Sequence, residues 1–422
     1  MNPARDLAFR ALQRWRRSRQ FADRIAQELF STADPSAADK AFALELFYGV
    51  LRNLTLLDFW IGRLRSGPVE PGARDLLRLG LYQIMPLETA PHAAVFETVE
   101  LAPARTRKLI NAILRRASRE KPDLMKMAEV QPPAVRFSEP EFLIEKWTGQ
   151  FGEEVMLELC RWNNQPPPVY ARINQLKLSP TEFLQRYPNN EPLLEPSGFV
   201  RSTAPGVAIA NGDCYVQDPS TALAPELLAP FPNQTVLDAC AAPGGKTAHL
   251  AQLMGNTGRL VAIDQDEGRL ERLRENLNRL GVKNARILRC DWRDKDSISA
   301  TGLERESFDK ILLDAPCSNT GVMRRRVDVR WRLRPDDFVR MPQQQLAILR
   351  AVAPFLKPGG SLVYSTCSLE TEENEAVVAA FLRGAEEFGL MAEEKRLPFR
   401  DATDGAFAAR LTRHPRNGGP VG

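Results

Sequence analysis

The sequence predicts an α/β protein, with a doubly wound, mostly parallel sheet in its C-terminal half. An all-helical domain and a small mixed α/β subdomain are expected before that sheet. Two observations lead to this prediction. Apolar residues recur at helical spacing through the first 120 residues. From about residue 205, short apolar strands alternate with helical segments, which is typical of βαβ units and a parallel sheet.

The composition is that of an ordinary globular protein of several domains. The chain has 422 residues, of which 43% are hydrophobic and 26% charged. It contains no run of about 18 apolar residues, so we expect no membrane-spanning helix. The six cysteines are scattered, the histidines number only three, and no secretory signal is apparent. We therefore expect reduced thiols, a cytoplasmic location and no metal site.

Residues 1–130 are expected to form the all-helical domain. Helical spacing is clearest over residues 4–15, 42–51, 76–85 and 109–114, and Pro86 is expected to end the third of these helices. The region holds 21 Lys and Arg against 15 Asp and Glu, a local excess of six positive charges. Such a basic module suggests a polyanionic partner, although charge alone does not distinguish this from a solvated surface.

Residues 131–205 are expected to form the small mixed subdomain. Proline-rich breaks at residues 131–133 and 165–168 border a helix predicted over residues 142–160. A strand is predicted over residues 169–173.

Residues 206–412 carry the alternating pattern, and residues 413–422 are expected to be a flexible tail. The expected strands are 236–238, 260–264, 285–288, 310–314 and 361–365, and the expected helices are 246–254, 269–280 and 344–355. A turn is predicted at residues 358–360 before the last of these strands. In such sheets ligands bind at the carboxyl ends of the strands, where several acids of this sequence lie.

The segment DACAAPGGKT, from Asp238 to Thr247, predicts a cofactor-binding loop between a strand and a helix. Small residues let the backbone approach a ligand, and a helix N-terminus offers free N–H groups. The spacing of a P-loop or of a nicotinamide loop is absent. Asp264 and Asp291 follow the next two strands, where they can meet a ribose and an adenine base. Because acids surround this loop, we expect a nucleoside without phosphates, such as S-adenosylmethionine.

Two cysteines follow the ends of adjacent predicted strands. Cys317 comes three residues after Asp314, and Cys367 ends the next strand. Carbon 5 of a cytosine becomes nucleophilic once a thiolate adds to carbon 6, and an acid near ring nitrogen 3 stabilises the charge that develops. Cys367, Cys317 and Asp314 can supply the nucleophile, the group that assists release and the acid. The residues alone leave open which thiol attacks.

The chain resembles the RNA 5-methylcytosine methyltransferases, and its N-terminal domain resembles the RNA-binding domain of the antitermination factor NusB. The matching segments are VQDPSTAL (216–223), DACAAPGGKT (238–247), AIDQD (262–266), CDW (290–292), DAPCSNTGV (314–322) and VYSTCSLETEENE (363–375). The resemblance implies a class I Rossmann-like methyltransferase domain that uses S-adenosylmethionine.

The resemblance also implies residue roles. Cys367 matches the nucleophile, Cys317 the residue that helps to release the product, and Asp314 can also face the target base. The implied cofactor-binding residues are Cys240, Ala241, Ala242, Pro243, Gly244, Gly245, Lys246, Asp264, Asp291 and Asp314.

The implied activity is C5 methylation of one cytosine of 16S rRNA, at the 967-type site, by a protein that we expect to be monomeric. The same chemistry on tRNA, and a non-enzymatic NusB-like assembly or antitermination factor, are the alternatives. The intact loop and thiol motifs argue against the non-enzymatic alternative. The sequence departs from the family pattern at Asn319, Arg326, Val327, Thr371 and Ala406. These departures bear on the identity of the RNA target more than on the reaction.

Overall fold

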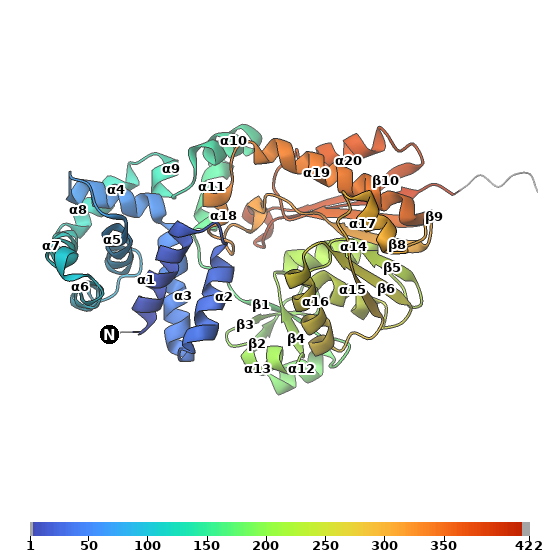
Figure 1. Cartoon of the computed structure of the whole chain (residues 1–422), viewed down its shortest axis with the longest axis horizontal. Coiled ribbons are helices and arrows are strands. Elements are labelled where there is room, and N and C mark those ends of the chain that lie inside the picture. The colour runs from blue at the N-terminus through green and yellow to red at the C-terminus, as the bar shows by residue number, and fades with distance from the viewer. Residues whose placement is uncertain (1–2, 416–422) are drawn as a thin grey trace, which may run out of the picture. The chain divides into compact units, whose positions relative to one another are not determined.

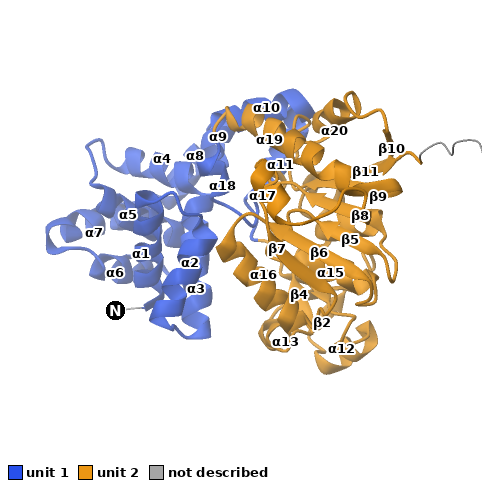
Figure 2. Cartoon of the chain, turned by 45° about the vertical axis from the view of Figure 1, so that its right-hand side comes forward, with its two compact units in different colours: residues 1–166, 323–333 blue, residues 167–322, 334–422 orange. Residues whose placement is uncertain are grey.

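The structure, a computed structural model, describes residues 3–415, and its chain divides into two compact units (Figure 2). Unit 1 comprises residues up to 166 together with 323–333, and unit 2 comprises 167–322 and the residues from 334 onward. The predicted 131–205 subdomain is therefore divided: its residues up to 166 belong to unit 1 and the remainder to unit 2. Among the described residues no helix is long and apolar enough to cross a bilayer.

Unit 1 is all-helical, as the periodicity predicts (Figure 1). Its helices are α1 (Pro3–Arg17), α2 (Ala22–Ala33), α3 (Ala37–Arg52), α4 (Leu54–Leu64), α5 (Pro71–Ile84), α6 (Pro91–Glu100), α7 (Ala104–Arg119), α8 (Lys121–Glu129), α9 (Pro133–Arg136), α10 (Glu141–Phe151), α11 (Glu153–Asn163) and α18 (Val329–Arg332).

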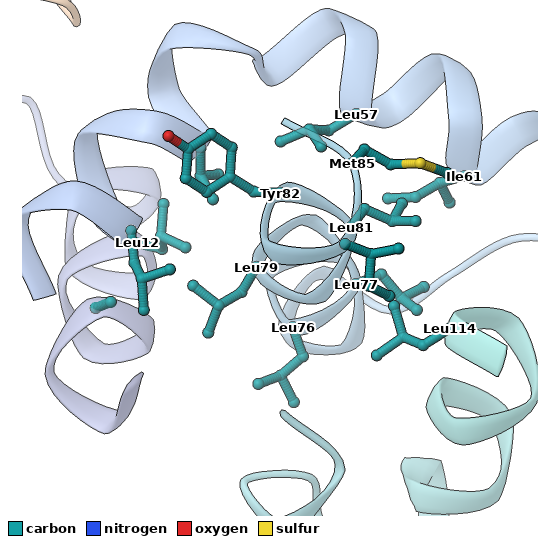
Figure 3. Packing of buried hydrophobic residues seen from close by; sticks show 14 of the residues in the cluster. Leu12, Leu57, Ile61, Leu76, Leu77, Leu79, Leu81, Tyr82, Met85 and Leu114 are labelled. Atoms are coloured by element: carbon teal, nitrogen blue, oxygen red, sulfur yellow. The ribbon is translucent and has the colours of Figure 1, made fainter. Parts of the chain in front are cut away.

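Helix α5 runs through the core of unit 1 and packs against α1, α3, α4, α6 and α7. Its residues 76–85 are buried almost without interruption, because neighbours surround it on several sides. In Figure 3 Leu77 lies toward Leu114 of α7, and Leu81 lies toward Ile61 of α4.

The helix predicted over 142–160 is in fact two helices, α10 and α11. Gly152 separates them with φ of 85°, a backbone conformation that favours glycine over other residues. The apolar spacing continues across the break, which is why the sequence pattern conceals it.

The segment 323–333 leaves unit 2 and is built into unit 1. Asp328 accepts hydrogen bonds from Trp15 Nε1 at 3.2 Å and from the Ala22 backbone N–H at 2.8 Å. Arg330 lies 3.0 Å from Glu139 Oε1, and both side chains are fully buried. Residues 323–333 are thus an integral part of the core of unit 1.

Unit 2 contains a seven-stranded sheet in the order β10-β11-β9-β8-β5-β6-β7. The strands are β5 (Thr235–Asp238), β6 (Arg259–Asp264), β7 (Ala285–Arg289), β8 (Phe308–Asp314), β9 (Leu356–Thr366), β10 (Phe388–Arg396) and β11 (Ala406–Arg413). The first five of these pair in parallel, and β11 pairs antiparallel with both β9 and β10. The doubly wound, mostly parallel sheet is therefore confirmed.

Helices cover both faces of this sheet (Figure 1). They are α14 (Leu223–Leu228), α15 (Gly245–Leu253), α16 (Glu267–Leu280), α17 (Lys295–Ala300), α19 (Asp337–Val352) and α20 (Glu375–Leu382). Alternate residues of β8 point to opposite faces: Leu312 packs with residues of α14 and α15, whereas Ile311 and Leu313 pack with residues of α19 and α20.

Three details differ from the sequence prediction. Residues 358–360 lie within β9 rather than in a turn before it, and β10 and β11 were not predicted. Strand β11 extends to Arg413, where the flexible tail was expected to begin. Residues 416–422 of that predicted tail lie outside the described residues.

A second, four-stranded sheet begins unit 2, in the order β2-β3-β1-β4. Its elements are β1 (Tyr170–Ile173), α12 (Pro180–Arg186), β2 (Asn190–Pro192), β3 (Phe199–Ser202), α13 (Gly206–Ala210) and β4 (Cys214–Val216). All its neighbouring strands are antiparallel, and its apolar side chains form a small core of their own.

Candidate active site

Three adjacent strands, β5, β8 and β9, deliver the main site residues to one edge of the sheet. Asp238 ends β5, Asp314 ends β8, and Cys367 follows the last residue of β9. Asp314 is in register with Ser365, so the two strands end at the same level. The structure therefore brings Asp314 and the predicted thiols together.

The two thiols are in contact. The Sγ atoms of Cys317 and Cys367 are 3.4 Å apart, and Cys317 is 7% exposed. The contact with Cys367, then burial, raises the pKa of Cys317 well above its usual range. The protonated thiol is therefore the favoured form of Cys317 at neutral pH.

Asp314 forms an ion pair with Lys246 beside these thiols. Lys246 Nζ lies 2.6 Å from Asp314 Oδ2, and Ser365 Oγ donates to Asp314 Oδ1 at 2.9 Å. Burial opposes the charged form of Lys246, but the Asp314 carboxylate outweighs it and raises the Lys246 pKa. Lys246 and Asp314, both predicted to bind the cofactor, are thus paired with each other next to the thiols.

The predicted cofactor loop connects β5 to α15. Asp238 Oδ2 accepts a hydrogen bond from Thr247 Oγ1 at 2.7 Å, and burial raises the Asp238 pKa to about 7. Asp264 accepts the Ala242 backbone N–H at 3.2 Å, which ties the loop to the end of β6. Asp291 lies after β7, and its carboxylate is bound by Arg293 at 2.8 Å.

The polar groups at this loop match those of S-adenosylmethionine. Asp238 Oδ1 is buried and has no hydrogen-bond partner within the described residues. Helix α15 starts at this loop without a side-chain cap, so its first N–H groups are available to a ligand. A buried acceptor and free amide donors suit the ammonium and carboxylate of a methionine moiety. Residues 240–246 would hold that moiety.

A pocket of about 350 Å³ opens next to Cys367 and Lys246. Asp218, Asp404 and Phe407 also line it. Asp218 Oδ1 accepts the backbone N–H of Asp404 at 3.0 Å, so this hydrogen bond fixes one wall. Residue-by-residue reasoning missed these three lining residues, and only the matching VQDPSTAL segment pointed toward Asp218.

The residues that depart from the family pattern lie in different places. Asn319 contacts both thiol residues: its Nδ2 donates to the Cys317 carbonyl at 2.8 Å, and its Oδ1 lies 3.4 Å from Cys367 Sγ. Ala406 lines the pocket. Val327 is instead buried in the core of unit 1.

Comparison with known families agrees with this architecture. The profile described as 16S rRNA methyltransferase RsmB/F matches residues 225–415, the NusB family profile matches residues 2–119, and the ferredoxin-like domain profile of RsmF/B-like methyltransferases matches residues 139–202.

Relatives match nearly the whole chain. The probable ribosomal RNA small subunit methyltransferase B of Bacillus subtilis is 35% identical, over 93% of this chain and 91% of that protein. The ribosomal RNA small subunit methyltransferase B of Klebsiella pneumoniae is 38% identical, over 89% of this chain and 90% of that protein.

A solved structure shares the fold of about two thirds of the chain. A methyltransferase homologue from Pyrococcus horikoshii is 30% identical, with a TM-score of 0.58, over 67% of this chain and 97% of that chain. The chain therefore belongs to the RsmB/F family of RNA methyltransferases, which use S-adenosylmethionine as cofactor.

Proposed function

We propose that this protein methylates carbon 5 of one cytosine in 16S rRNA, with Cys367 as the nucleophile. The observation that carries the proposal is the contact between the Cys317 and Cys367 thiols, 3.4 Å apart, beside Asp314. Methylation of an exocyclic amine needs no thiol, whereas C5 chemistry needs one to form a covalent bond and another group to assist its release.

The chain's own residues perform the covalent steps. The Cys367 thiolate adds to carbon 6, so that a sulfur–carbon bond forms and an electron pair moves toward carbon 5. S-adenosylmethionine, when bound, supplies the methyl group that carbon 5 receives. A base then takes up the proton from carbon 5, and the electron pair released expels the Cys367 thiolate. The Cys317 thiol assists this release by donating a hydrogen bond to the departing sulfur. The Asp314–Lys246 ion pair, which lies beside the thiols, is proposed to stabilise the charge that develops at ring nitrogen 3.

Unit 1 is proposed to bind the RNA backbone. Helix α7 exposes basic side chains along its length, and these are Arg105, Arg107, Lys108, Arg115, Arg116 and Arg119. Contacts between such side chains and phosphates supply affinity without reading sequence. The target cytosine must be unpaired or flipped out, because carbon 6 is attacked from the face of the ring.

The direct test is transfer of labelled methyl from S-adenosylmethionine to purified unmodified 16S rRNA, followed by bisulfite mapping. One protected cytosine would support the proposal. Incorporation into tRNA alone would overturn the assigned substrate. No incorporation into either RNA, while equilibrium dialysis shows that the cofactor binds, would overturn the reaction.

A further inference from the structure

The loops that carry the two thiols interlock. The Gly321 backbone N–H donates to the Cys367 carbonyl at 2.9 Å, and the Leu369 N–H donates to Thr320 Oγ1 at 2.9 Å. A Cβ on Gly321 would lie 2.6 Å from the Cys367 carbonyl oxygen, so only glycine permits this close approach. The separation of the thiols therefore depends on what holds these loops together.

A single buried carboxylate joins both loops. Glu373 is 0% exposed, and its Oε2 accepts the Ser318 backbone N–H at 2.9 Å and Gln345 Nε2 at 2.8 Å. Its Oε1 accepts Ser368 Oγ at 2.7 Å and also the hydroxyl of Ser318. Ser318 directly follows Cys317, and Ser368 directly follows Cys367.

Gln345 extends this arrangement to the residue before Cys317. Its Nε2 group donates to the Pro316 carbonyl at 3.0 Å as well as to Glu373. The loop that carries Cys317 is thus held on both sides of the thiol. A buried carboxylate costs several kcal/mol of desolvation unless donors surround it, and here four donors do so. An apolar side chain would fill this space without that cost. The hydrogen bonds of Glu373 therefore indicate a role beyond filling volume.

We propose that Glu373 is a positioning residue for the thiol pair. It holds Cys317 against Cys367 and keeps Cys317 as the thiol that assists release, rather than as a second nucleophile. This inference rests on the proposed function of the two cysteines. Glu373 touches neither substrate nor cofactor and acts through Ser318 and Ser368.

The electrostatics support the same assignment. The Glu373 charge adds to the Cys367 contact and to burial in raising the Cys317 pKa. The backbone of Asn319 donates toward Cys317 and opposes this effect. Glu373 therefore favours the protonated thiol at Cys317.

Two variants separate the charge of Glu373 from its reach. Glu373→Gln keeps the length of the side chain, and its amide can still bridge the loops once the serine hydroxyls rotate, but the charge is lost. Glu373→Asp keeps the charge and is too short by one methylene to bridge both loops. Glu375→Gln is the matched control, because Glu375 pairs with Lys395 on β10 instead.

The measurement is alkylation of each cysteine against pH, followed by peptide mapping, and it needs no RNA. We expect the midpoint for Cys317 to fall by roughly one pH unit in Glu373→Gln and to stay near wild type in the control. In Glu373→Asp we expect kcat for methyl transfer to fall at least about tenfold, while KM for RNA changes less than about twofold.

Several outcomes would overturn the inference. An unchanged midpoint of Cys317 alkylation in Glu373→Gln would do so. Faster alkylation at every pH without a shift of this midpoint would do so too, because loosening of the thiol loops alone produces that pattern. Unchanged kcat in Glu373→Asp would refute the positioning role. Wild-type protein that fails to methylate RNA would instead count against the proposed function, and the alkylation result would still stand.

Discussion

Cys317 and Cys367 are identical thiols in different surroundings, and the proposed function gives them different roles. We expect Cys367→Ala to abolish methylation and to form no covalent complex with RNA, because no sulfur remains to attack carbon 6. We expect Cys317→Ala to accumulate a covalent protein–RNA adduct through Cys367, because release is impaired. Denaturing gels with labelled RNA measure both results. An adduct with the first variant and none with the second would exchange the roles.

Asp238 makes stability depend on pH in the opposite sense to an ordinary salt-bridged acid. Its pKa is about 7 in the folded protein against 3.8 in the unfolded chain, because burial disfavours the charge. Between these values the folded state keeps a proton that the unfolded state loses, so this contribution declines as pH rises from about 4 to 7.

Asp238→Asn removes that titration. For cofactor-free protein we expect the melting temperature of the variant, relative to wild type, to rise across this window and to level off above about pH 7. Asp309→Asn is the control that should stay flat between pH 4 and 7, because Lys357 outweighs burial and lowers the Asp309 pKa below 3.8, so its contribution is lost only at lower pH. An Asp238→Asn difference that stays flat between pH 4 and 7 would refute the assignment.

At the scale of elements, two glycines of unit 1 lie in contrasting surroundings. A Cβ on Gly80 of α5 would lie 2.6 Å from Leu114 Cδ1 of α7, whereas one on Gly62 of α4 would meet nothing within 4 Å. We expect Gly80→Ala to lower the free energy of unfolding by about 1–3 kcal/mol through overpacking. We expect Gly62→Ala to raise it by about 0.5–1 kcal/mol through helix propensity. Urea unfolding measures both, and equal effects would contradict the packing.

The sequence predicted elements wherever local signals were strong. Short apolar strands that end in an acid located β5, β6 and β8, and the paired thiol motifs located the reacting residues. Strand β10 was missed because its residues are largely exposed and follow no regular alternation. Glu373 was missed because it stands in a run of acids that reads as a solvated surface. Only long-range folding buries it, and no local pattern reports that.

At the scale of the whole molecule, the chain passes between the two units at 166/167, at 322/323 and at 333/334. The returning segment contributes Arg330, whose guanidinium pairs with buried Glu139 and also donates to the Asn163 carbonyl at 3.2 Å. Sequence neighbours gave no hint of this partnership, because its members lie far apart along the chain.

Loss of Arg330 should therefore be costly. We expect Arg330→Met to lower the free energy of unfolding by about 3–5 kcal/mol, because Glu139 is left buried without its partner. The double variant Arg330→Met/Glu139→Leu should recover most of this loss, since neither charge remains. Denaturant unfolding of the full chain provides the measurement. A single variant as stable as wild type would show that the pair is dispensable.

Strand β11 has a consequence for biosynthesis. It comes after every other strand in the sequence, yet it lies between β9 and β10, with Phe407 in register with Thr366. The strand that precedes Cys367 thus has an open edge until residues 406–413 have emerged and paired. A nascent or prematurely terminated chain can hold all its site motifs and still lack the neighbour that orders them. We therefore expect the end of β9 beside Cys367 to become ordered only after residues 406–413 have been synthesised.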